Sequence, residues 1–310
     1  MRKSIALYID KVAHSVDSFL APRMRARVDS QLVAEWILRS EDPGSVQYPA
    51  VYLDFMRQWH ESSKLQVDWI KRPKDSLSDS ALRCLTLLQE IGSRMPIPRL
   101  SIARAVAHAA DRLLSLRNEF GYDRWAADMG LHFYISSSLA RKGRLLCAAM
   151  RFIRPKRILE LGTAYGMSSF LMGQKLDCLL DTWSITTVEV DARIHPVASS
   201  LLQGAFGKRV SCLLGNSRDV LGQFRASQAS FDFLFHDADH SFDAYVSDFE
   251  AAEPMLMPGA ALLIDDIRWE DERFHVEAPR TYEGWRRIVE HPRVVMAVEL
   301  DQCVGLAILR

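Results

Sequence analysis

The chain has 310 residues, which is enough for one large domain or for two smaller ones. Hydrophobic residues make up 48% and charged residues 25% of the sequence, and both values are ordinary for a globular protein. Lys and Arg together number 39, as do Asp and Glu, so the formal net charge is zero. This balance argues against a nucleic-acid-binding protein, because such proteins usually carry a basic excess.

The cysteines and the N-terminus indicate the cellular compartment. Five cysteines are widely spaced and form no CxxC pair, which argues against a disulfide framework or a zinc site. Charged residues interrupt the short apolar run after Met1 too early for a signal peptide, and no apolar stretch is long enough to span a bilayer. The sequence therefore predicts a cytoplasmic protein that does not bind membranes.

Residues 1–130 differ in pattern from the rest of the chain. Apolar residues recur here at three- and four-residue spacing, and no clear alternating strand pattern is present. Breakers such as Asp42-Pro43-Gly44 separate the periodic stretches. We expect a helical domain that forms a lid over the substrate site or a homodimer contact.

Residues 131–310 predict an α/β domain. Short apolar runs alternate with helix-like stretches, an order that indicates a mostly parallel sheet covered on both faces. The expected strands are 157–161, 183–190, 209–214, 231–235 and 260–264, with helices near 166–177, 193–204, 217–226 and 241–256. Two last runs, 294–299 and 304–309, should pair as an antiparallel hairpin. A Rossmann-like sheet of five parallel strands plus such a hairpin is typical of class I methyltransferases.

A glycine-containing loop follows the first expected strand. Residues 160–166 read ELGTAYG, and Ser168 lies at the start of the next helix. The glycines permit a tight turn and a close approach of ligand to backbone. The pattern E-x-G-x-x-x-G differs from the G-x-G-x-x-G of dinucleotide enzymes, which hold a pyrophosphate. It suits S-adenosylmethionine, which has no pyrophosphate and whose carboxylate a helix N-terminus can hold.

The next two strands supply further cofactor candidates. The second strand ends at Glu189, where a carboxylate can accept hydrogen bonds from both ribose hydroxyls. The third ends just before Ser217, which is placed to contact adenine. A glycine loop alone is weak evidence and can be merely structural. The glycine loop, the acidic residue that ends the second strand and the polar turn after the third follow one another in βαβ order, and together they favour a cofactor site.

Acidic residues follow the fourth and fifth strands. Asp237, Asp239 and His240 come after the fourth strand, and Asp265 and Asp266 come after the fifth. The carboxyl ends of adjacent parallel strands meet at one edge, so these carboxylates should crowd together and repel unless protonated or bound to a cation. An all-oxygen cluster suits Mg²⁺. The alternative is that these acids only end strands or cap helices.

Three segments carry a family resemblance that covers roughly residues 135–310. Residues 142–146 (KGRLL), 155–163 (PKRILELGT) and 235–240 (FHDADH) resemble the catechol and caffeoyl-CoA O-methyltransferases. The resemblance implies that Glu160, Gly162 and Ser168 line the methionine end of S-adenosylmethionine, that Glu189 binds the ribose, and that Ser217 and Ala238 border the adenine. The remaining expected cofactor-binding residues are Thr163, Gly166 and Asp237.

The resemblance also implies a metal site and a catalytic base. Asp237, Asp265 and Asp266 match the metal ligands of those families. The families carry Asp-Asn on the fifth strand, whereas Asp265-Asp266 is similar to sugar O-methyltransferases of antibiotic pathways. The catechol family places a catalytic lysine where this chain has His240, and Asp239 is the other candidate for the base.

The expected reaction is Mg²⁺-assisted methyl transfer from S-adenosylmethionine to a hydroxyl of a small natural product. One alternative is a carboxyl methyltransferase acting on a peptide or small molecule, which would need neither metal nor base. A second is a regulatory protein that binds the cofactor without catalysis. A third is a metal-binding relative of the same fold with different chemistry, such as hydroxylation.

Overall fold

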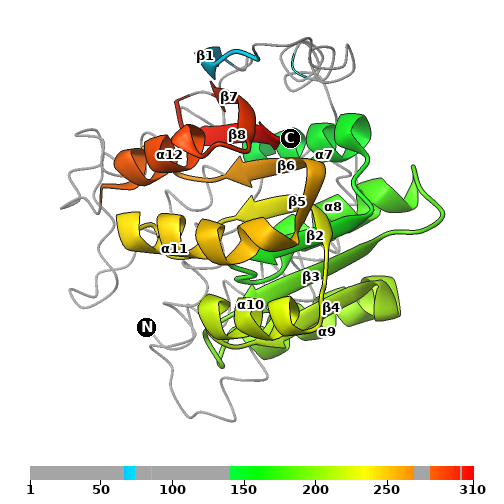
Figure 1. The fold of residues 1–310 in the computed structure, drawn as a ribbon. Helices are drawn as coiled ribbons and strands as arrows, with labels where there is room; N and C mark the ends of the chain where they lie inside the picture. Colours follow the sequence, from blue (N-terminus) through cyan, green and yellow to red (C-terminus); the bar gives the residue numbers. More distant parts are fainter. Residues whose placement is uncertain (1–65, 74–84, 86–139, 269–279, 301) are drawn as a thin grey trace, which may run out of the picture.

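The computed structural model describes residues 66–73, 85, 140–268, 280–300 and 302–310. Most of the helical domain expected over residues 1–130 therefore lies outside the described residues, and its role as a lid or dimer contact stays a prediction. A single sheet with helices on both faces forms the described part (Figure 1).

The sheet contains eight strands within the described ranges. They are β1 (Val67–Lys71), β2 (Arg157–Leu161), β3 (Ser184–Glu189), β4 (Val210–Leu214), β5 (Phe231–His236), β6 (Leu256–Ile264), β7 (Val294–Leu300) and β8 (Val304–Leu309). Their order across the sheet is β1-β7-β8-β6-β5-β2-β3-β4. The five strands from β6 to β4 are parallel, and β8 pairs antiparallel with both β6 and β7. The predicted fold class is thus confirmed.

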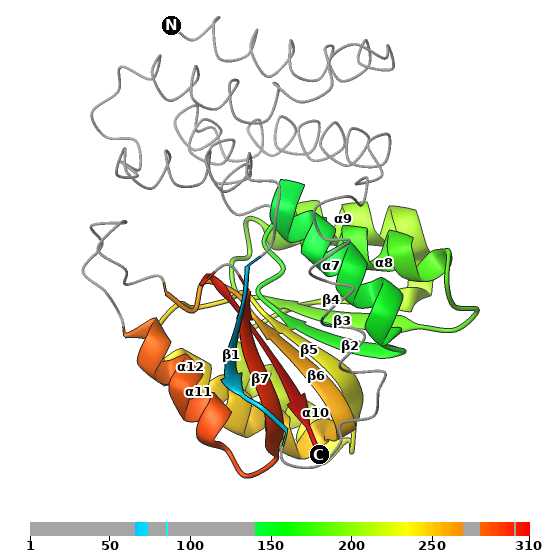
Figure 2. The same ribbon diagram turned by 90° about the horizontal axis from the view of Figure 1, so that it is seen from above.

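Six α-helices cover the sheet in the part of the chain that the structure describes. They are α7 (Ala140–Ile153), α8 (Met167–Asp177), α9 (His195–Phe206), α10 (Ser217–Ala226), α11 (Phe242–Ala252) and α12 (Thr281–Glu290), with short 3-10 turns η1 (Gly207–Arg209) and η2 (Glu253–Met255). Helices α7, α8 and α9 lie on one face and α10, α11 and α12 on the other (Figure 2). Each face buries its own hydrophobic cluster against the sheet, as the alternation of strands and helices requires.

Strand β1 was not predicted from the sequence. It lies within the segment expected to be helical and pairs antiparallel with β7, with Trp69 opposite Val298. Its five side chains are all partly exposed, which is typical of an edge strand. The sequence VDWIK is too short and too irregular in polarity to show a period of two. Main-chain hydrogen bonds to β7, not a local pattern, therefore define this strand.

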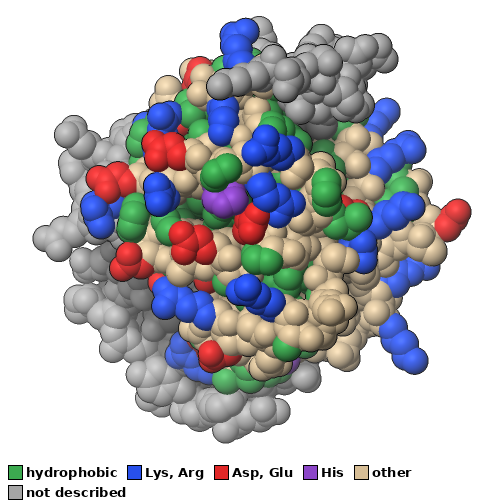
Figure 3. Space-filling view, viewed as in Figure 1, with side chains coloured by type: hydrophobic (Ala, Val, Ile, Leu, Met, Phe, Trp, Pro, Cys, Tyr) green, Lys and Arg blue, Asp and Glu red, His purple; other side chains and the backbone are tan. Residues whose placement is uncertain are grey.

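The face formed by α10, α11 and α12 carries Lys and Arg side chains interspersed with Asp and Glu (Figure 3). This mixture agrees with the equal numbers of basic and acidic residues in the sequence. Among the described helices, none combines the length and the apolar character needed to cross a bilayer.

Candidate active site

Gly162 brings the loop after β2 into direct contact with the loop after β5. Its φ angle is +93°, in the region that favours glycine. A Cβ atom built on Gly162 would lie 1.9 Å from the carbonyl oxygen of Asp237. The residue before Gly162 also joins the two loops, because the carbonyl of Leu161 accepts a 2.8 Å hydrogen bond from the Asp237 amide. The glycine loop and the first acid of the predicted metal site are therefore neighbours.

Glu160 is fully buried beneath this loop. Its carboxylate accepts hydrogen bonds from the hydroxyls of Ser168, Ser169 and Thr187, and so links β2 to α8 and to β3. Burial raises the pKa of Glu160 to about 7, although the three hydroxyl donors oppose the rise. The carboxylate is thus occupied by protein hydroxyls, and its predicted contact with the methionine end of the cofactor stays a prediction.

A Glu160→Gln variant is expected to remove part of the pH dependence of stability. The carboxyl group keeps its proton up to a pKa of about 7 when folded but loses it near 4.5 when unfolded. The folded state then binds more protons between these values, so the free energy of unfolding falls as the pH rises through this window. Glutamine does not titrate. Urea unfolding of both proteins at several pH values measures the effect. If the free energy of unfolding changes with pH equally in both proteins, the raised pKa of Glu160 is contradicted.

Glu189 ends β3 opposite the glycine loop. Its carboxylate accepts hydrogen bonds from the amides of Ala164, at 2.7 Å, and Asp191, at 2.8 Å. Burial raises its pKa, and these amide donors oppose the rise. The next residue, Val190, is 69% exposed, which is unusual for a valine at a strand end. An exposed apolar side chain beside a fixed carboxylate suits a ligand with a polar part and a flat apolar part.

Ser217 lies in the first turn of α10, whose N-cap is Asn216. The Ser217 hydroxyl donates a 2.8 Å hydrogen bond to Asp248 on α11. The other carboxylate oxygen of Asp248 lies 3.1 Å from Nε2 of His236, at the end of β5. Asp248 is buried and was not predicted as a site residue, because nothing in its local sequence distinguishes it from a solvent-facing helix residue.

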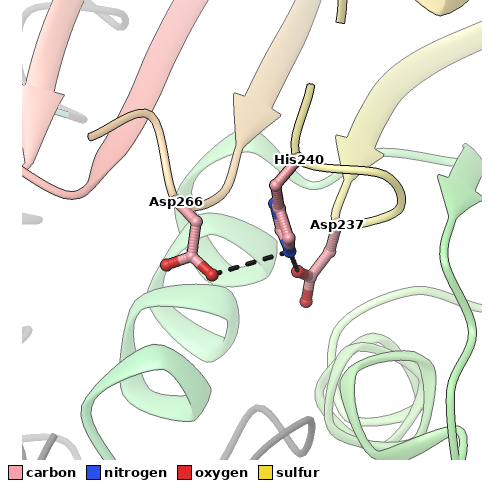
Figure 4. A group of neighbouring side chains, drawn as sticks. All are labelled: Asp237, His240 and Asp266. Carbon is pink, nitrogen blue, oxygen red and sulfur yellow. Dashed lines mark ion pairs between the residues drawn. The ribbon is translucent and has the colours of Figure 1, made fainter. Parts of the chain in front are cut away.

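The predicted acids after β5 and β6 do converge. Asp237, His240 and Asp266 each offer an atom within 4.8 Å of the others, and their side chains point toward one another (Figure 4). His240 Nε2 lies 3.7 Å from an oxygen of Asp266 and 3.9 Å from an oxygen of Asp237. Asp239, the other candidate for the base, is exposed.

Lys142 is a site residue that the sequence did not assign. It extends from α7 into the acidic cluster, where its ammonium contacts the carboxylate of Asp265 and lies 3.7 Å from Asp266. Burial lowers its pKa, but the neighbouring carboxylates outweigh burial and hold the pKa well above the usual value. The Asp265 side chain is 1% exposed and contacts the Lys142 ammonium. The side chains of Asp237 and Asp266 instead lie next to His240. The signal for Lys142 was the KGRLL segment, which indicated a family but no role.

The donor set fits a divalent cation. Burial raises the pKa of Asp237 well above its usual value, and the charge of Asp265 adds to this rise. Burial and the charge of Asp266 raise the pKa of Asp265 to about 6. When the three carboxylates are ionised, the Lys142 ammonium leaves a formal charge of −2 in the cluster. A divalent ion would neutralise this charge. Of the three expected ligands, Asp237 and Asp266 are placed to share such an ion, whereas Asp265 is held by Lys142 and its role as a ligand stays a prediction.

Known proteins resemble this chain over the same region. Residues 159–267 match a family described as a methyltransferase domain. The caffeoyl-CoA O-methyltransferase of Stellaria longipes is 28% identical over 143 residues, which cover 45% of this chain and 56% of that protein. The catechol O-methyltransferase of Mus musculus is 29% identical over 131 residues, covering 41% and 48%. The match thus spans about half the length of these curated relatives.

Solved structures share the fold. An O-methyltransferase from Bacillus cereus in complex with SAH has a TM-score of 0.51 at 20% identity, covering 65% of this chain and 90% of its own. A SAH-bound methyltransferase from Podospora anserina has a TM-score of 0.50 at 16% identity, covering 76% and 97%. Residues 159–267 thus match a methyltransferase domain, the described part of the chain has the fold of solved methyltransferases, and caffeoyl-CoA and catechol O-methyltransferases are among the proteins that it is similar to.

Proposed function

We propose that this protein transfers the methyl group of S-adenosylmethionine to a hydroxyl oxygen of a small natural product, assisted by Mg²⁺. The observation that carries this proposal is the contact between the glycine loop and the acidic cluster. Gly162 packs against the main chain of Asp237, so a methyl donor held over the loop lies beside an acceptor held at the cluster. Such juxtaposition of the reacting atoms is the main requirement of a methyl transfer.

The cofactor would lie along the carboxyl ends of β2, β3 and β4. The main chain of Gly162, Thr163 and Gly166 and the first turn of α8 at Ser168 would hold its amino-acid part. Glu189 would accept hydrogen bonds from the ribose, and Val190 would cover one face of the adenine. Ser217 and Ala238 would border the adenine; the hydroxyl of Ser217 is already directed at Asp248, so its contact would be through the main chain.

The acidic cluster would serve the acceptor. When bound, Mg²⁺ would lower the pKa of the acceptor hydroxyl. Asp237 and Asp266 would hold the ion, while Lys142 keeps the buried charge of Asp265 neutralised. Asp239 is the better candidate for the base, because it is exposed to an incoming acceptor whereas His240 Nε2 faces two carboxylates.

A hydroxyl acceptor fits this cluster better than a carboxylate. The carboxylate alternative needs no metal, and without a metal the ionised carboxylates of the cluster, with a formal surplus of −2, would repel an anionic acceptor. The names of the curated relatives refer to catechol and caffeoyl-CoA, which also supports a small molecule. From its sequence, we also propose that the protein is cytoplasmic and forms a homodimer.

A Glu189→Ala variant is expected to bind S-adenosylhomocysteine about 10- to 100-fold more weakly than the unchanged protein. The loss reflects the removal of a charged acceptor from the ribose and of the support for the Ala164 amide. Isothermal calorimetry measures it, and Glu250→Ala on the exposed side of α11 serves as the control. Absence of binding by the unchanged protein would overturn the assignment of the cofactor.

Turnover tests the remaining parts of the proposal. A panel of phenols, sugars and carboxylic acids is incubated with S-adenosylmethionine in Mg²⁺ or in EDTA, and mass spectrometry counts the methyl groups gained. We expect methyl ethers in Mg²⁺ and little product in EDTA. Methyl esters formed equally in both buffers would instead identify a carboxyl methyltransferase without metal.

A further inference from the structure

The orientation of the His240 ring is set by a chain of two hydrogen bonds. The Tyr245 hydroxyl lies 2.6 Å from the carbonyl oxygen of Asp265, and it donates there because a carbonyl oxygen can only accept. The same hydroxyl lies 3.1 Å from Nδ1 of His240. Since the single hydroxyl proton is directed at Asp265, Nδ1 of His240 must donate to the hydroxyl oxygen.

This arrangement selects one tautomer of the neutral imidazole. With the proton on Nδ1, the lone pair lies on Nε2, the nitrogen that faces Asp237 and Asp266 (Figure 4). Metal-binding histidines typically have this geometry, in which the second ring nitrogen donates to a fixed acceptor and so orients the first. Tyr245 is itself fully buried, so its hydroxyl is a fixed acceptor.

The spacing around Nε2 also suits a shared ion. The separations of 3.7 and 3.9 Å from the two carboxylates are longer than a hydrogen bond. Two ligands that each lie roughly 2.1 Å from one ion are about 3 to 4 Å apart, depending on the angle between them. A lone pair on Nε2 of the neutral ring and two ionised carboxylates at this spacing repel one another, and either a proton on Nε2 or a metal cation among the three groups removes the repulsion.

We propose that His240 is a ligand of the divalent cation, together with Asp237 and Asp266, and that the site therefore prefers Mn²⁺ and similar transition ions to Mg²⁺. Imidazole suits transition ions, whereas Mg²⁺ prefers oxygen ligands alone. The inference rests on the proposed function only in that both place a metal at this cluster. It replaces the predicted role of His240 as the base, which then falls to Asp239.

The test is the electron spin-echo envelope modulation of bound Mn²⁺. An imidazole bound directly to Mn²⁺ produces ¹⁴N modulation, which an all-oxygen site does not. We expect this modulation in the unchanged protein and its loss in His240→Gln, with Mn²⁺ affinity at least about tenfold lower in the variant. His291→Gln, which alters a partly exposed histidine after α12, is the matched control and should keep both signals. Unchanged S-adenosylhomocysteine binding by each variant shows that it is folded.

Tyr245→Phe provides a second variant. It removes the acceptor of the Nδ1 proton and should weaken Mn²⁺ binding about 10- to 100-fold. Equal affinities for Mn²⁺ and Mg²⁺, or bound Mn²⁺ without ¹⁴N modulation, would overturn the inference while leaving the Mg²⁺ site of the proposed function intact. Absence of any Mn²⁺ or Mg²⁺ binding would overturn both metal proposals, and methyl transfer would then be judged by turnover in EDTA.

Discussion

A Gly162→Ala variant is expected to lose S-adenosylhomocysteine binding and about 4 kcal/mol or more of its free energy of unfolding. The added methyl group would lie 1.9 Å from the Asp237 carbonyl oxygen, and neither can rotate away, because the main chain fixes the position of a Cβ atom and the carbonyl belongs to the main chain. The φ angle of +93° adds strain for any residue with a Cβ atom. The loop after β2 would have to separate from the loop after β5, so the cofactor site and the acidic cluster would be distorted together.

Calorimetric titration and urea unfolding measure the two effects. Gly204→Ala is the matched control, because Gly204 lies inside α9 and an added Cβ atom there would meet nothing within 4 Å. Alanine favours a helix over glycine, so this control should be as stable as the unchanged protein or about 1 kcal/mol more stable. Cofactor binding that survives Gly162→Ala would show that the two loops can move apart without cost to the site.

A Lys142→Met variant is expected to lower the free energy of unfolding by about 3–5 kcal/mol in the absence of divalent ions. The substitution keeps most of the apolar stem but removes the only ammonium that the described residues place against Asp265. A carboxylate that is 1% exposed would then have to remain charged without a counterion or take up a proton. The double variant Lys142→Met with Asp265→Asn should regain much of the loss, because it removes the buried charge as well.

Urea unfolding in EDTA compares the single and double variants. Lys208→Met, at an exposed lysine of η1, is the control and should change the free energy of unfolding by less than about 0.5 kcal/mol. Equal stability of Lys142→Met and the unchanged protein would mean that Asp265 is neutral in the folded state and that Lys142 is not its counterion.

Much of the sheet could be read from local patterns. Strand β2 begins and ends at the predicted residues, and β3 to β6 lie within a few residues of their predicted limits. Buried parallel strands produce short β-branched runs that alternate with helices, and this signal is contained in neighbouring residues. The same rule placed Asp237 and Asp266 together, because each follows one of two adjacent parallel strands.

Other features depend on contacts between distant parts of the chain. The hairpin was predicted, but only the tertiary structure places β8 between β6 and β7 and adds β1 at the edge. Lys142, in the first turn of α7, contacts Asp265 after β6, and Tyr245 on α11 orients His240. A periodic pattern reports which face of an element is buried but not which partner it meets. The sequence alone therefore determined the strands and the acidic residues that follow them. Packing decided that the Lys142 ammonium joins these acids and which nitrogen of the His240 ring faces them.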